Sequence, residues 1–97
     1  MVLVAGTKIV ASQEQVSCRL GSDAAILNLK NGTHYGLDPV GARVWNLLQQ
    51  PRTLAELRDI LIAEYDVDPA QLESDIRELL SQLADNELVE ISRSARQ

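Results

Sequence analysis

The sequence has few of the residues that most catalytic and metal sites require. It contains one cysteine, Cys18, and one histidine, His34, among 97 residues. These numbers exclude a disulfide within the chain and a zinc site built from thiolates or imidazoles. No apolar run approaches the roughly 20 residues of a membrane span, and the first residues lack the pattern of a secretory signal. We expect no metal, no cofactor, no membrane association and a cytoplasmic location.

Aromatic residues are also scarce, and positive charge is in deficit. Tyr35, Trp45 and Tyr65 are the only aromatic residues, so the core must be built mainly from Leu, Ile and Val. Fourteen acidic residues against nine basic ones give a net charge of −5. Binding to a phosphate backbone depends on Lys and Arg displacing counterions, so nucleic acid is a disfavoured partner. Peptide and protein partners remain.

The composition changes near Pro39, which predicts a sheet followed by helices. Gly, Asn and β-branched residues prevail before Pro39, and Leu, Ala, Glu and Arg prevail after it. Two short strands are expected at 7–12 and 17–20, in one ribbon that turns at Gly21. Alternating runs on either side of Asn31-Gly32 predict a hairpin with a type I′ turn. We therefore expect a small three-stranded antiparallel sheet over about residues 7–37.

Three cap-like sequences divide the second half of the chain into helices. Asp38-Pro39 and Asp68-Pro69 place a capping side chain before a proline at the first helical position. Thr53 is followed three residues later by Glu56, as in a capping box. The predicted helices cover about 39–49, 53–65 and 69–86, with Asn86 as a left-handed terminator and a short final strand at 88–91. The expected fold is a single α+β domain spanning 1–97, a winged helix-turn-helix preceded by the sheet.

Two long segments resemble a known family. They are LNLKNGTHYGLDPVGARVWNLL and TLAELRDILIAEYDVDPAQLESDIRELLSQLADNELVEI, which together cover about Ala24 to Ile91. The ordered motifs YxLDxxGxxxW, TLxEL, DIxxLLxxL and a final LV pair are similar to those of the PqqD-like peptide chaperones, the recognition elements of ribosomally made, modified peptides. The chain is most similar to the free-standing leader-binding proteins of lasso-peptide biosynthesis. It departs from the quinone-cofactor branch, because Leu29-Lys30-Asn31 stands where that branch has a Pro-Glu pair.

The resemblance implies a binding protein and no enzyme. Members of this family hold the leader of a precursor peptide as an added strand on the third strand of their sheet, and the third helix forms the other wall. Separate enzymes, in lasso systems a leader protease and a cyclase, then modify the presented core. The expected partners are therefore a precursor leader peptide and these modifying enzymes.

The residues of the third predicted strand are compatible with that role. Exposed sheet edges are usually blunted by Lys, Pro or a bulge, and the run from Thr33 to Leu37 has no proline and no side chain ionised at neutral pH. The alternative is a central strand that is paired on both sides. His34 could otherwise suggest a general base, but without a matching nucleophile it is interpreted as a surface residue. The predicted peptide-binding residues are Thr33, His34, Tyr35, Gly36 and Leu37 on the strand, and Asp75, Ile76, Leu79, Leu80 and Leu83 on the helix.

The margins of the third helix determine how it would face a peptide. Asp75 and Gln82 lie on one margin, and Glu73 and Leu80 on the other. Leu80 is expected to be an exposed apolar residue on its margin, and Tyr35 could be either a groove residue or a core residue. The sequence leaves open which margin faces the strand.

Two other functions compete with peptide capture. Winged helix-turn-helix folds commonly bind DNA through the third helix, but residues 69–87 here contain five acids and a single base, Arg77. Such a helix would repel a phosphate backbone. A generic interaction or dimerisation adaptor remains open. An enzyme is disfavoured because the sequence has no glycine-rich phosphate loop and no nucleophile motif.

Overall fold

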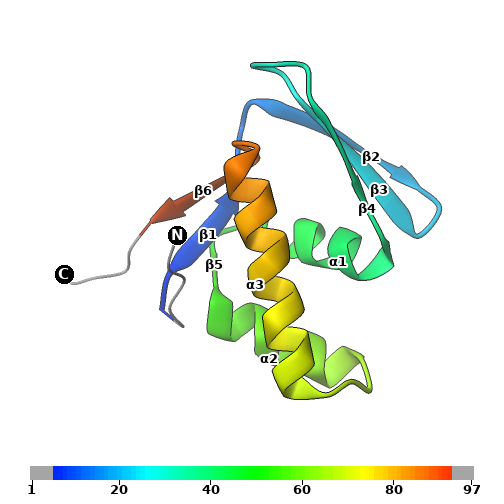
Figure 1. The fold of residues 1–97 in the computed structure, drawn as a ribbon, viewed down its shortest axis with the longest axis vertical. Helices are drawn as coiled ribbons and strands as arrows, with labels where there is room; N and C mark the ends of the chain where they lie inside the picture. The colour runs from blue at the N-terminus through cyan, green and yellow to red at the C-terminus, as the bar shows by residue number, and fades with distance from the viewer. Residues whose placement is uncertain (1–5, 93–97) are drawn as a thin grey trace.

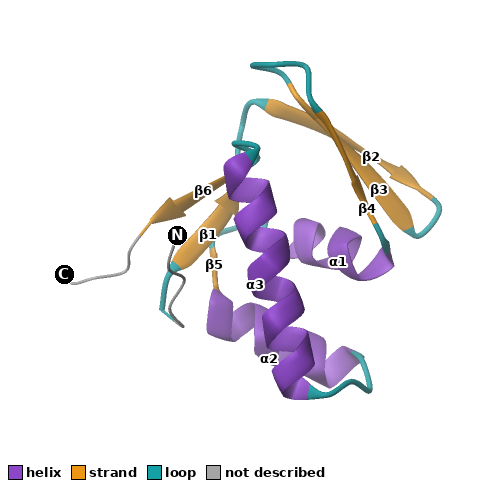
Figure 2. Ribbon diagram, viewed as in Figure 1, coloured by secondary structure: helices purple, strands orange, loops and turns teal. Residues whose placement is uncertain are grey.

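The computed structural model describes residues 6–92, and the ends of the predicted domain lie outside this range. The fold is α+β, as predicted, and the helix bounds agree with the sequence to within two residues. Three helices followed by a strand are consistent with a winged helix-turn-helix (Figures 1 and 2). The elements are β1 (Lys8–Ala11), β2 (Gln15–Leu20), β3 (Asp23–Asn28), β4 (His34–Leu37), α1 (Pro39–Leu47), β5 (Arg52–Thr53), α2 (Leu54–Glu64), α3 (Pro69–Asp85) and β6 (Val89–Ser92).

The strands form two sheets, so the prediction of one sheet over residues 7–37 is wrong for the first strand. One sheet has the order β5-β1-β6 and the other has the order β2-β3-β4, with all neighbours antiparallel. β1 pairs with the last strand, where Ile9 lies opposite Ile91. The chain then leaves this sheet at Ser12, whose N–H donates to the carbonyl of Leu88 at 2.8 Å. These partners lie at the far end of the sequence, so no local pattern could predict them.

The two turns of the β2-β3-β4 sheet differ from each other. Gly21 and Ser22 connect β2 to β3, and Gly21 has φ +69°. The hairpin predicted around Asn31-Gly32 is confirmed, but its type I′ turn is not. A five-residue loop, 29–33, connects β3 to β4, and only Gly32 in it has a positive φ. The side chains of Asn28 and Asn31 accept from the N–H groups of Lys30 and Thr33 and hold the loop in this shape.

All three predicted helix starts are confirmed. The carboxylate of Asp38 accepts from the N–H of Gly41 at 2.7 Å, and that of Asp68 accepts from the N–H of Gln71 at 3.3 Å. Thr53 and Glu56 form the reciprocal bonds of a capping box. At the end of α3, however, Asn86 has φ −93° and the left-handed residue is Glu87, with φ +57°.

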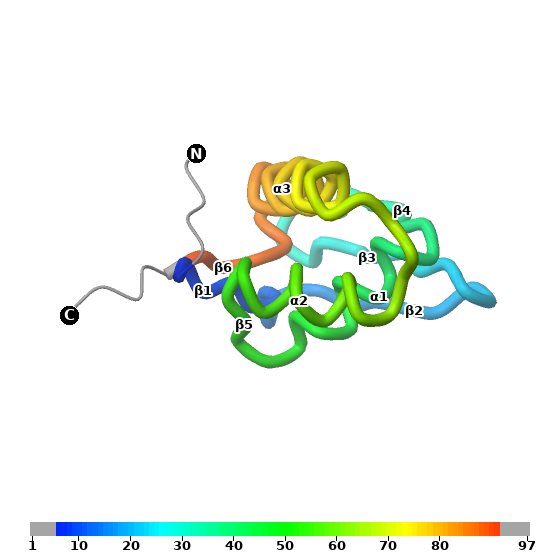
Figure 3. The backbone as a smooth tube through the Cα atoms, turned by 90° about the horizontal axis from the view of Figure 1, so that it is seen from below, coloured from blue at the N-terminus to red at the C-terminus, as the bar shows by residue number. Residues whose placement is uncertain are grey.

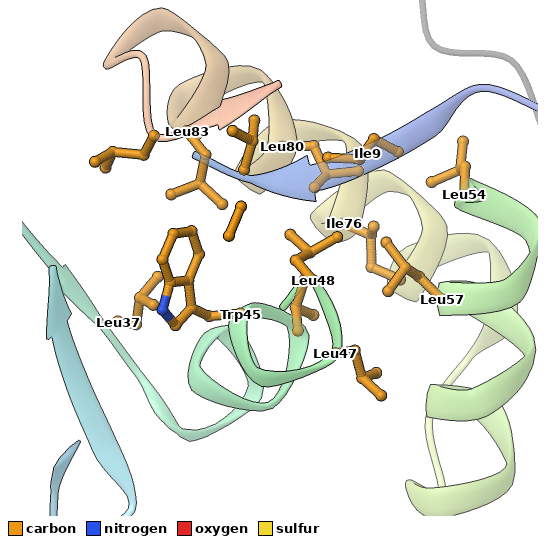
Figure 4. Packing of buried hydrophobic residues seen from close by; sticks show 14 of the residues in the cluster. Ile9, Leu37, Trp45, Leu47, Leu48, Leu54, Leu57, Ile76, Leu80 and Leu83 are labelled. Carbon is orange, nitrogen blue, oxygen red and sulfur yellow. The ribbon is translucent and has the colours of Figure 1, made fainter. Parts of the chain in front are cut away.

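One aliphatic core joins the helices to both sheets (Figure 4). Trp45 is only 4% exposed and stands in the middle of this core, between β4 and α3. On β3 the core face carries Ala24, Ile26 and Asn28, whereas Ala25 and Leu27 share the half-exposed opposite face. The largest fully buried aliphatic side chains are Ile9, Ile26, Val44, Leu48, Leu57, Leu61, Ile76, Leu80, Leu83 and Leu88.

Asn28 is a buried polar link between β3 and the end of α3. It is 1% exposed, and its Nδ2 donates to the carbonyl of Asn86 at 2.7 Å while its Oδ1 accepts from the N–H of Lys30. Replacing Asn28 with Ala leaves the carbonyl of Asn86 and the N–H of Lys30 without this hydrogen-bond partner. We therefore expect the free energy of unfolding to fall by about 1–3 kcal/mol. Urea denaturation measures the change. Asn31→Ala removes one exposed bond and is expected to have a smaller effect; equal midpoints for both variants would contradict the role of Asn28.

Candidate functional site

β4 is an edge strand. It pairs with β3 alone, so the alternative of a central strand is excluded. The ladder matches Leu27 with His34, Ile26 with Tyr35, Ala25 with Gly36 and Ala24 with Leu37. The other long side of β4 is therefore available for pairing, as predicted from the absence of proline and charge.

One hydrogen bond at the start of the β3–β4 ladder shows which backbone groups of β4 face away from β3. The N–H of Asn28 donates to the carbonyl of Thr33 at 2.9 Å, which makes this facing pair a hydrogen-bonded one. Bonded and non-bonded pairs alternate along an antiparallel ladder. Tyr35 and Leu37 therefore direct their N–H and C=O groups toward β3. His34 and Gly36 direct theirs away from the sheet, so four backbone groups lie along the free edge.

A groove of about 490 Å³ lies beside this edge, between β4, α1 and the segment 72–79 of α3. In Figure 1, α1 is drawn between α3 and β4. The lining of the groove is mainly apolar. It can accept apolar side chains from every second residue of an extended peptide, because side chains alternate between the two faces of a strand. The lining residues are Tyr35, Gly36, Leu37, Asp38, Val40, Gly41, Val44, Val67, Leu72, Asp75, Ile76 and Leu79.

The structure brings most of the predicted site residues together. Six of the ten line the groove: Tyr35, Gly36, Leu37, Asp75, Ile76 and Leu79. Thr33 and His34 are exposed where β4 begins, outside the groove lining. That each of these residues contacts a peptide remains a prediction.

Leu80 and Leu83 are not at the groove. Both are completely buried, so the prediction that Leu80 is an exposed margin residue is wrong. The physical reason is that α3 packs against α2 and β6 as well as facing β4, which covers that part of its apolar stripe. The margin that faces β4 is the one with Asp75, Leu79 and Gln82.

Tyr35 connects the two walls of the groove. Its ring is half-buried and lines the groove, and its hydroxyl donates to Oε1 of Gln82 on α3. Burial raises the pKa of the Tyr35 hydroxyl above its usual value, and the negative charges of Glu78 and Asp38 raise it further. Tyr35 is thus a groove residue with a bonded polar tip.

The charge around the groove is negative. Asp38 and Asp75 line it, Glu78 acts on Tyr35 from α3, and no Lys or Arg is among the lining residues. Arg77, the one basic residue of α3, and Arg58 of α2 bind Glu73 at 3.3 and 3.1 Å, and neither is among the lining residues. A neutral or basic ligand is therefore favoured over a phosphate backbone.

Three groove residues have roles that the sequence did not reveal. Val40 and Val67 are exposed at 37% and 45% and extend the apolar lining into solvent. Val67 lies between two acidic residues in the loop before α3. An isolated apolar residue in a polar loop is the sequence feature that could have indicated its role in the groove. At Gly41, a Cβ would lie 3.2 Å from both the Asp38 carboxylate and Leu37 Cδ2, so glycine allows α1 to begin close against β4.

Residues 6–92 contain neither a metal-binding cluster nor a membrane-spanning helix. No group of three His, Cys, Asp or Glu side chains there is arranged to hold a metal ion. None of the helices in this range is both long enough and apolar enough to cross a membrane.

The chain matches one family model and is similar to solved structures. The family model, described as coenzyme PQQ synthesis protein D (PqqD), matches residues 23–89, more than half of the chain. A structure described as TbiB1 in complex with the TbiA(beta) leader peptide is 36% identical, with TM-score 0.77, over 91% of this chain and 99% of that one. A structure of lasso peptide synthetase B1 complexed with the leader peptide shares the fold, at 21% identity and TM-score 0.73, over 84% and 96% of the two chains. No curated protein sequence gives a significant match.

Proposed function

Because this chain belongs to the PqqD family, we propose that it binds the leader segment of a ribosomally synthesised precursor peptide and catalyses no reaction itself. The observation that carries the proposal is that the unpaired edge of β4 lies directly beside an apolar groove. The 36% identical structure, which holds a leader peptide, supports it.

The mode of binding is strand addition. An extended leader lies along β4 and exchanges hydrogen bonds with the outward N–H and C=O groups of His34 and Gly36. Side chains alternate between the two faces of a strand, so every second leader residue enters the groove between β4 and α3. The backbone bonds contribute affinity for any extended segment, and the groove selects the sequence.

The groove chemistry indicates which leader it selects. Apolar side chains fit against Val40, Val67 and Leu79, the accessible apolar residues of the lining, where they are removed from water. Beside them, the exposed carboxylate of Asp75 accepts a bond from Gln71 at 2.9 Å and has room for a further donor. We expect the leader to have an apolar residue at every second position. We also expect a Lys or Arg at the position that lies near Asp75.

The modifying enzymes are the second class of partner in this proposal. A non-catalytic module that holds the leader presents the rest of the precursor to a leader protease and a cyclase, as in lasso-peptide maturation. Such an encounter takes place in the cytoplasm, where the precursor is synthesised. The 36% identical structure, described as a complex with a leader peptide, supports the leader-holding part of this proposal.

Removing the charge of Asp75 should weaken leader binding moderately. Exposed ion pairs contribute about 0.2–1 kcal/mol, so we expect Asp75→Asn to reduce the affinity roughly twofold to fivefold, and less at high salt. Calorimetric titration at two salt concentrations measures this effect. Glu90→Gln makes the same charge change on β6, away from the groove, and should leave the affinity unchanged. Equal losses in the two variants would indicate only a general effect of net charge.

The proposal itself is tested by titrating a fluorescently labelled leader with the protein. The leader is taken from a short precursor gene that neighbours this one. Saturable binding with Kd of micromolar or tighter is expected, as is competition by the unlabelled leader. No saturation below about 100 μM, which corresponds to roughly −5.5 kcal/mol, would contradict the proposed function.

A further inference from the structure

The exposed large apolar side chains of residues 6–92 fall into two groups. Val40 and Val67 line the groove, whereas Val16, Leu20 and Leu29 are 55%, 60% and 56% exposed in the β2-β3-β4 hairpins and are not among the lining residues. Facing residues of an antiparallel pair lie on the same side of the sheet. Val16 faces Leu27 and Cys18 faces Ala25, so β2 presents Val16, Cys18 and Leu20 on the side opposite to the buried Ala24 and Ile26. We call this side the outer face.

β2 is the second free edge of the same sheet. It pairs with β3 alone, and five of its six residues are exposed. The N–H of Leu29 donates to the carbonyl of Glu14 at 3.0 Å, and alternation along the ladder then directs the backbone groups of Gln15, Ser17 and Arg19 away from the sheet. The strand has no Pro, no Lys and one charged residue, so it lacks the usual protection of an edge.

We propose that β2 pairs antiparallel with β2 of a second copy of this chain, about a two-fold axis at Cys18. The proposal goes beyond leader capture and requires no leader. In this register Ser17 and Arg19 of the partner subunit form a hydrogen-bonded pair. Val16 faces Leu20 of the partner subunit, and Cys18 faces Cys18 of the partner subunit.

The sequence of β2 favours a second copy as the occupant because it is self-complementary in this register. Apolar residues of the outer face meet apolar residues, and Arg19 meets a serine, so no charge faces a like charge. A register centred on Ser17 would also pair the outward groups, but it would place Leu20 opposite Glu14 of the partner subunit. The axis at Cys18 avoids that mismatch.

The arrangement leaves both leader grooves open. β2 lies on the side of its sheet that is away from α3 (Figure 3), and β4 is the opposite edge. Pairing therefore joins two three-stranded sheets into one with β4 at each end. A single strand pair buries much less than the roughly 800 Å² per partner of a stable interface, so the dimer is reversible and forms at high protein concentration.

Sedimentation equilibrium of the full chain without leader tests this inference. The mass should rise toward twice that of the monomer as the concentration increases from about 10 μM to about 1 mM, a range suited to a small interface. Val16→Lys places a charge opposite Leu20 of the partner subunit and should keep the protein monomeric. Leu29→Lys alters an equally exposed residue in the β3–β4 loop and should dimerise normally. A monomer at every concentration overturns the inference, and so does an equal loss in both variants, which would indicate stacking of outer faces.

Disulfide formation tests the register. Cys18 is exposed, and a non-hydrogen-bonded pair places its Cα about 4.5 Å from that of the partner's Cys18, close enough for a disulfide. Oxidised glutathione should therefore convert the protein to a covalent dimer. In a Cys18→Ser, Ser17→Cys variant the two thiols lie diagonally, with Cα atoms roughly 7–8 Å apart, and cross-linking should be at least about tenfold slower. Equal rates would overturn the axis at Cys18.

Discussion

Replacing Gly36 with proline should reduce leader affinity by about tenfold to a hundredfold while the protein stays folded. The N–H of Gly36 faces outward, so proline removes a donor to the added strand and none from the β3–β4 ladder. The lost hydrogen bond contributes roughly 0.5–1.5 kcal/mol, and the proline ring also obstructs the approach of the leader backbone. Fluorescence anisotropy with the labelled leader measures the affinity, and circular dichroism verifies the fold.

Gly36→Ala is the matched control for this variant. A Cβ at Gly36 would meet no atom within 4 Å, and alanine keeps the N–H. The alanine variant should bind within roughly threefold of the natural protein, since its outward donor is unchanged. A folded proline variant that binds as tightly as the alanine variant would exclude strand addition at this position.

Replacing Val67 with asparagine should weaken leader binding about tenfold. Val67 is 45% exposed and belongs to the groove lining, so the substitution leaves the core intact. An apolar leader side chain that covers the amide would bury it without a hydrogen-bond partner, which costs about 1–3 kcal/mol. The substitution is neutral, so the acidic character of the groove stays the same and the effect is not electrostatic.

Leu29→Asn distinguishes a groove effect from a general loss of surface hydrophobicity. Leu29 is 56% exposed but lies in the β3–β4 loop, outside the groove lining. Its replacement should leave leader affinity unchanged. If Leu29→Asn and Val67→Asn weaken binding equally, the leader does not occupy the groove between β4 and α3.

The features that the sequence predicted best are those with local causes. Helices begin directly after Asp38, Thr53 and Asp68 because each of these side chains accepts a bond from an N–H three residues further along the chain. The position of the β3–β4 hairpin followed from Asn31-Gly32 for the same reason. Its turn type did not follow, because the side chain of Asn28 also bonds within the loop.

The features that the sequence could not predict depend on distant partners. Nothing near Ile9 indicates that it pairs with Ile91, so β1 was assigned to the wrong sheet. On α3, Leu79 and Leu80 are adjacent and chemically identical, yet one lines the groove and the other is completely buried. Only the packing of α2 and β6 against α3 distinguishes them. On the strand half of the site, the absence of proline and charge was visible in the sequence, but only the sheet order shows that β4 is an edge and not a central strand.

Amide hydrogen exchange of β4, followed by NMR with and without the leader, tests strand addition most directly. In the free protein the N–H groups of Tyr35 and Leu37 should be protected by β3, whereas those of His34 and Gly36 should exchange rapidly. Addition of the leader should protect His34 and Gly36 and leave the pattern of the other two unchanged. Rapid exchange of His34 and Gly36 in the saturated complex, or their protection in the free protein, would contradict binding of the leader along β4.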